Sequence, residues 1–174
     1  NKFKTNSSSS SSSSSAPFRD GEKILPENML RTIFLTAFPL LVSGLFATKP
    51  GISYESIRKP SWTPPPFVFP IVWTILYILM GFASSRVVDI AGYASVPVVL
   101  YFVQLVLNLS WTPVFFDRGD FSLALTILRA LILAVFVTTV AFWRVDTVAG
   151  AILVPYIAWL AVAHELNRNI VNSN

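Results

Sequence analysis

The chain of 174 residues has no cysteine, a single histidine and few charged side chains. Without cysteine it can form neither a disulfide nor a thiolate metal site, and one histidine leaves too few ligands for a metal site built from protein side chains alone. The sequence contains no P-loop, dinucleotide fingerprint or nucleophile elbow. It also lacks the basic stripe with interleaved aromatic residues that indicates a nucleic-acid partner. We therefore expect no metal, no required cofactor and no bound nucleic acid.

Charged residues make up only 13% of the chain and hydrophobic residues 53%, whereas ordinary soluble domains are about 25% charged. Apolar runs of about 20 residues are long enough to cross the hydrocarbon core of a bilayer as helices. Five such runs are present, at residues 29–48, 66–85, 96–116, 121–143 and 148–167. The sequence thus predicts an all-α integral membrane protein, a bundle of five transmembrane helices in contact with the lipid bilayer.

Residues 1–28 have a different composition, with nine consecutive serines at positions 7–15 and no acidic residue before Asp20. Polyserine cannot bury enough surface to offset its ordering entropy, so we expect a disordered tail. Serine-rich, acid-poor segments are also typical of organellar transit peptides. This favours a eukaryotic organelle, either the mitochondrial outer membrane or a plastid membrane. The predicted organisation is a tail at 1–28, a transmembrane domain at 29–170 and a short C-terminal end at 171–174.

Three of the predicted helices carry aromatic and polar side chains on one face. A proline-rich turn at 64–66 leads into the second span, where Trp73 and Tyr77 lie one turn apart. The third and fifth spans repeat the pattern at spacings of three and four residues. The residues expected to bind a ligand are Pro64, Pro65, Trp73, Tyr77, Gln104, Asn108, Trp111, Tyr156, Trp159, Ala163, Leu166 and Asn167.

These faces have two interpretations. They can line a pocket for a flat, largely apolar ligand, held by stacking and a few hydrogen bonds. Alternatively, they pack the helices together, with Gln104 and Asn108 forming hydrogen bonds between helices. Both interpretations place the two amides in the interior of the bundle, because an amide that faces lipid is costly.

Two ionisable side chains lie in or beside the last two spans. Arg129 is within the fourth span, and its long side chain can reach the nearer membrane surface. His164 is expected to form hydrogen bonds at the membrane edge with Glu165 and Arg168. We assign neither residue a role in binding.

Over about residues 30–167 the chain resembles the family of translocator proteins, also called tryptophan-rich sensory proteins or peripheral benzodiazepine receptors. The resemblance rests on three blocks that occur in order: Lys59-Pro60-Ser61-Trp62 with Pro64, Pro65, Trp73 and Tyr77; Asn108 through Trp111 with Pro113 and Phe115-Phe116; and Pro155-Tyr156 with Trp159, Ala163 and Leu166-Asn167. Three ordered blocks are more specific than any single motif.

This resemblance implies a membrane receptor or sensor, often a homodimer, that binds tetrapyrroles such as protoporphyrin or haem and benzodiazepine-type drugs. Carried over by position, the pocket would be lined by Trp73, Asn108, Trp111, Trp159, Ala163 and Leu166 and capped by the loop before Pro64. The family also implies transport or turnover of the ligand. Two alternatives stay open: a light-dependent porphyrin-degrading enzyme using Trp73 and Trp159, and a structural subunit of a larger organellar membrane complex.

Overall fold

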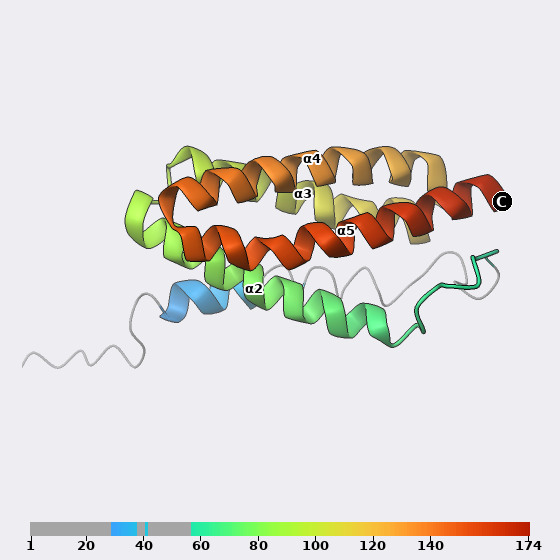
Figure 1. Ribbon diagram of the computed structural model, residues 1–174, viewed down its shortest axis with the longest axis horizontal. Coiled ribbons are helices and arrows are strands. Elements are labelled where there is room, and N and C mark those ends of the chain that lie inside the picture. Colours follow the sequence, from blue (N-terminus) through green and yellow to red (C-terminus); the bar gives the residue numbers. More distant parts are fainter. Residues whose placement is uncertain (1–28, 38–40, 42–56) are drawn as a thin grey trace, which may run out of the picture.

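The computed structural model describes residues 29–37, 41 and 57–174, and regular structure in this part of the chain is helical. Four long helices follow one another: α2 (Val68–Ala91), α3 (Val96–Phe116), α4 (Phe121–Val145) and α5 (Thr147–Ser173) (Figure 1). Each is long and apolar enough to cross a membrane. The protein is therefore an integral, multi-pass membrane protein whose outer surface contacts the lipid bilayer.

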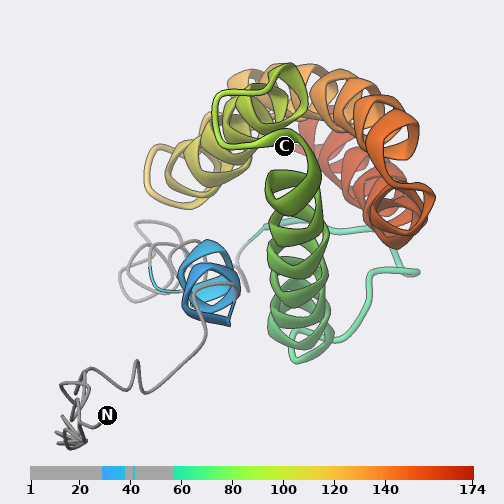
Figure 2. The same ribbon diagram turned by 90° about the vertical axis from the view of Figure 1, so that its left-hand side faces the viewer.

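The first predicted span is described only in part. Residues 29–37 are helical and lie beside α2 (Figure 2), where Thr32 Oγ1 donates to Ser85 Oγ over 2.8 Å. The rest of that span lies largely outside the described residues, as does the predicted tail at 1–28. The structure therefore supports the second to fifth predicted spans, and the first span stays a prediction.

The bounds of the helices agree with the apolar runs at α3 but extend beyond them in α2 and α5, and by two residues in α4. Residues 86–91 continue α2 because their charges find partners across the bundle. Arg86 Nε donates to Asp146 Oδ2 over 2.5 Å, and Asp89 pairs with Arg31. The hydrogen bond from Arg86 also holds the pKa of the Asp146 carboxyl, which lies between α4 and α5, below its usual value. In α5, Glu165 and Arg168 pair along the helix, so it continues to Ser173.

Short turns make α3, α4 and α5 antiparallel neighbours, as their spacing predicts, and α4 packs on both α3 and α5. Asp120 and Asp146 begin α4 and α5 by accepting hydrogen bonds from Leu123 N and Val148 N. Glycine is required at position 150, in the first turn of α5, because a Cβ there would lie 2.7 Å from the Trp143 Cα in α4. Among α3, α4 and α5, the helix α2 packs mainly on α5 and makes much less contact with α3.

Three segments meet at one end of the bundle. The Asn174 side chain donates to Arg58 O over 3.1 Å and accepts from Arg58 N over 3.2 Å, which ties the segment before α2 to the end of α5. Asn167 Nδ2 donates to Phe121 O over 3.1 Å, which brings the α3–α4 turn to the same place. We call this the α5-terminal end.

Candidate functional site

A cavity of about 420 Å³ lies among α2, α3, α4 and α5 toward the α5-terminal end. None of the described residues that line it carries a formal charge. They are Pro66, Phe69, Pro70, Trp73, Thr74, Tyr77, Asn108, Trp111, Thr112, Phe115, Phe116, Leu128, Leu131, Trp159, Ala163, Leu166, Asn167 and Ile170. The volume is in the range of small-molecule sites, and the apolar lining fits a largely uncharged ligand.

Aromatic rings form much of the cavity wall. The centroids of Trp73 and Tyr77 are 5.7 Å apart, and Phe69 meets Trp159 edge-on at 5.8 Å. On the α3 side, Trp111 stacks on Phe115 at 4.8 Å. Rings held by other rings in this way offer flat, rigid surfaces on which a planar ligand can stack.

A chain of hydrogen bonds lies beneath the cavity. Tyr77 Oη donates to Asn108 Oδ1 over 2.5 Å, and Asn108 Nδ2 donates to Tyr156 Oη over 2.7 Å. Tyr156 Oη in turn donates to Gln104 Oε1 over 3.3 Å. Since both amides are almost completely buried, the prediction that they face the bundle interior is confirmed. This network joins α2, α3 and α5 and holds the floor of the cavity.

A second polar contact fixes the wall near the α5-terminal end. Trp111 Nε1 donates to Asn167 Oδ1 over 3.2 Å, while Asn167 Nδ2 donates to the Phe121 carbonyl. Asn167 therefore links α3, the start of α4 and α5, and it orients the indole of Trp111. Both the oxygen and the nitrogen of its amide thus have a partner within the protein.

Trp159 differs from Trp111 because its indole nitrogen is buried and donates no hydrogen bond. Among the described residues it is the one buried side-chain donor or acceptor without a partner. A buried donor left unpaired costs about 1–3 kcal/mol. Other atoms of Trp159 line the cavity, whereas the nitrogen itself is shielded from it by neighbouring side chains, so a ligand would remove that cost only if its binding moved those side chains.

The structure brings most of the predicted ligand residues to the cavity but not all of them. Those that line it are Trp73, Tyr77, Asn108, Trp111, Trp159, Ala163, Leu166 and Asn167. Gln104 and Tyr156 lie beneath the floor, in the hydrogen-bond network. Pro64 and Pro65 precede α2, where the Pro65 carbonyl accepts a hydrogen bond from Val68 N. Most of the predicted capping loop before Pro64 lies outside the described residues.

Sequence reasoning missed several apolar lining residues. Leu128 and Leu131 come from α4, a helix without the aromatic and polar pattern of the other three. Phe115 and Phe116 follow Trp111 at the end of α3, and Phe69 shares the helix face of Trp73. For the phenylalanines a sequence signal was present, since Phe115-Phe116 belong to the second block of the resemblance, although they were not counted among the ligand residues.

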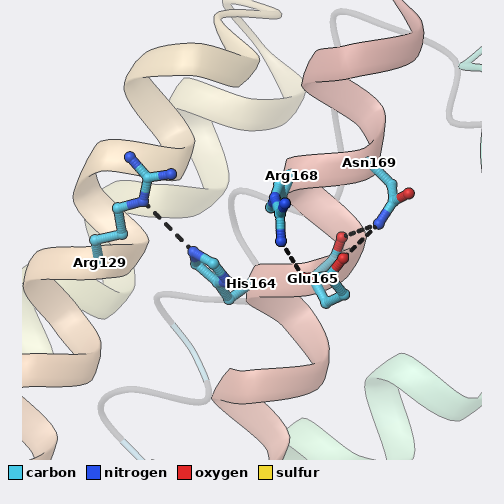
Figure 3. Close-up of polar contacts among 5 residues, drawn as sticks. All are labelled: Arg129, His164, Glu165, Arg168 and Asn169. Carbon is cyan, nitrogen blue, oxygen red and sulfur yellow. Dashed lines mark hydrogen bonds and ion pairs between the residues drawn. The ribbon is translucent and has the colours of Figure 1, made fainter.

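The expected contacts of His164 are wrong. Its imidazole accepts from Arg129 Nε over 3.4 Å, whereas Glu165 pairs with Arg168 and Asn169 (Figure 3). Residues 164 and 165 are adjacent, so their side chains point about 100° apart around α5. His164 therefore faces α4, and Glu165 faces the residues one turn further along its own helix.

Comparison with known proteins matches residues 32–172 to the model of the TspO/MBR family. The chain is 40% identical to protein CrtK of Rhodobacter capsulatus over 72% of its length and 80% of that protein. It is 39% identical to a tryptophan-rich sensory protein of Cereibacter sphaeroides, over 84% of the chain and 94% of the relative. It is 40% identical to the translocator protein of Homo sapiens, over 70% of the chain and 74% of the relative. Because these relatives come from bacteria and an animal, the predicted organelle stays a prediction.

Proposed function

The chain belongs to the TspO/MBR family, and from this premise we propose that it is a membrane receptor or sensor that binds tetrapyrroles, such as protoporphyrin or haem, in its aromatic cavity. The observation that carries the proposal is the uncharged, largely apolar cavity lined by aromatic rings, beside which the Nε1 of Trp159 is buried without a partner. A planar ring system can stack on Trp73 and Trp111. Binding that shifts the side chains around Trp159 would bring a ring nitrogen or another acceptor on the ligand within reach of its Nε1.

The lack of charge in the lining limits how a porphyrin would bind. Burying a carboxylate without a cationic partner is costly, and the described lining residues supply no cation. The two propionates of protoporphyrin would therefore stay at the α5-terminal end, near water, while the macrocycle enters the cavity. Binding should then depend on the ring and little on the carboxylates.

Quenching of tryptophan fluorescence by protoporphyrin tests this proposal. We expect saturable binding near micromolar, about −8 kcal/mol, and similar affinity for protoporphyrin dimethyl ester. Trp159→Phe keeps a ring but removes the donor, so affinity should fall about tenfold. Trp143→Phe is the matched control because Trp143 is exposed on α4 and lies outside the cavity.

Two results would count against the proposal. Equal affinity for protoporphyrin in Trp159→Phe and the intact protein would show that the indole nitrogen of Trp159 donates no hydrogen bond to the ligand. Absence of saturable binding to either porphyrin would favour a structural subunit, the alternative that needs no ligand.

A further inference from the structure

A second hollow lies on the outside of the bundle, between α4 and α5, and is lined by Arg129, Ile132, Ala161 and His164. Its volume is about 340 Å³, and it shares no lining residue with the aromatic cavity. Arg129 and Ala161 are exposed, so the hollow faces the surroundings of the protein. We call it the outer groove.

The Arg129 guanidinium has no acidic partner among the described residues. Its Nε donates to His164, and its two terminal nitrogens point away from the imidazole without a drawn contact (Figure 3). The nearest carboxylate along α5 is already occupied, since Glu165 Oε2 accepts from Arg168 and Glu165 Oε1 from Asn169. The outer groove therefore presents a positive charge with free donors.

The position of Arg129 along α4 sets its depth in the bilayer. It lies eight residues after Phe121, about 12 Å along the helix axis. Side chains on a helix tilt toward its N-terminus, which for α4 is the α5-terminal end. The guanidinium is thus directed back toward the nearer membrane surface, where lipid phosphates lie.

The apolar part of the outer groove lies deeper than the basic part. Ile132 is three residues further into the membrane than Arg129 on α4. On the antiparallel α5, Ala161 is three residues deeper than His164, and its small side chain leaves the groove open. The groove is therefore basic toward the surface and apolar toward the bilayer centre. A glycerophospholipid has the same order, with its phosphate at the surface and its acyl chains inward.

We propose that the outer groove binds an anionic glycerophospholipid, with its phosphate on Arg129 and His164 and an acyl chain over Ile132 and Ala161. Charge complementarity selects an anionic head group, because none of the described residues that line the groove is acidic and the neighbouring Glu165 is already paired with Arg168. The acyl chain explains why the groove extends inward past the guanidinium. This proposal does not rest on tetrapyrrole binding.

Native mass spectrometry of the purified full chain in detergent tests it, with dioleoylphosphatidylglycerol and dioleoylphosphatidylcholine as probes. The intact protein should bind phosphatidylglycerol more tightly, and Arg129→Gln should weaken that binding about fivefold. Arg118→Gln is the matched control, since Arg118 is exposed at the same end of the bundle but lies outside the groove. It should leave the affinity within about twofold of the intact protein.

A second variant tests the apolar half without changing charge. Ala161→Leu fills the inner part of the groove, so it should also weaken phosphatidylglycerol binding, and glycerol 3-phosphate without acyl chains should not compete. Equal losses in Arg118→Gln and Arg129→Gln would mean general attraction and would overturn the proposal. So would equal binding of the two lipids or unchanged binding in Ala161→Leu. A change of oligomeric mass in Arg129→Gln would assign the groove to a second copy of the chain instead.

Discussion

At the scale of single residues, Asn108 is the centre of the buried polar network. Its amide accepts from Tyr77 on α2 and donates to Tyr156 on α5, so one side chain on α3 connects three helices. Few residues can do this, because the position needs a donor and an acceptor in one short, planar group. Asn108 thus supports the floor of the cavity as well as lining it.

Replacing Asn108 with leucine should destabilise the protein by about 1–2 kcal/mol, since it removes two interhelical hydrogen bonds within the membrane. Thermal unfolding in detergent, followed by tryptophan fluorescence, measures the loss. Ser110→Ala is the control, because the Ser110 hydroxyl donates to Leu107 O within its own helix. Equal melting temperatures for Asn108→Leu and Ser110→Ala would contradict the role given to the network.

At the scale of helices, the close contact between α2 and the segment 29–37 depends on Gly81. A Cβ at this position would lie 1.9 Å from Thr36 Oγ1 and 2.9 Å from the Thr36 Cα. The helices approach closely here because glycine leaves space, and this approach allows Thr32 and Arg31 to reach Ser85.

Gly81→Ala should therefore cost about 1–3 kcal/mol, as overpacked sites do. The same thermal unfolding assay measures it. Removing the Thr36 side chain in the double variant Gly81→Ala/Thr36→Gly should recover part of the stability lost. If Gly81→Ala melts at the same temperature as the intact protein, the two helices do not pack this closely.

The helices also show what the sequence could and could not predict about the fold. The C-terminal bound of α3 matches its apolar run because Asp117, the first charged residue after the run, directly follows the last residue of the helix. The apolar run in α2 ends at Ser85, because the charged residues Arg86 and Asp89 indicate the end of a membrane span. In the structure they continue the helix, since Arg86 pairs with Asp146 and Asp89 pairs with Arg31. Pairing between distant residues cannot be read from hydropathy, so helix ends that depend on it were placed too early.

At the scale of the whole molecule, the arrangement predicts which loops share a side of the membrane. Asp117 and Ser173 both lie at the α5-terminal end, whereas Ala94, between α2 and α3, lies at the other. Because the chain has no cysteine, each introduced thiol is unique. In sealed vesicles, an impermeant maleimide should label Asp117→Cys and Ser173→Cys from the same side and Ala94→Cys from the opposite side. Labelling of Ala94→Cys together with Asp117→Cys would contradict the arrangement.

The cavity shows the limit of sequence reasoning at this scale. Helical spacing correctly put Gln104 and Asn108 on one face of α3. It does not tell how far along the helix the cavity extends, so it could not predict that Asn108 lines the cavity whereas Gln104 lies beneath it. Leu128 and Leu131 were missed because nothing in a leucine distinguishes a residue that lines a cavity from one that faces lipid. The predicted aromatic residues were easier to find, since tryptophan and tyrosine are uncommon enough to form a pattern.

The packing of α2 on α5 has a consequence for how the protein is made. The helices α3, α4 and α5 are joined by short turns, so their contacts are local in sequence and can form as each helix follows the last. The helix α2 is synthesised before them, and among these three helices its main partner is α5, the last of the bundle. The cavity between them cannot close until α5 has entered the membrane. Ligand binding would therefore report that biogenesis is complete, because every partially synthesised chain lacks one wall of the site.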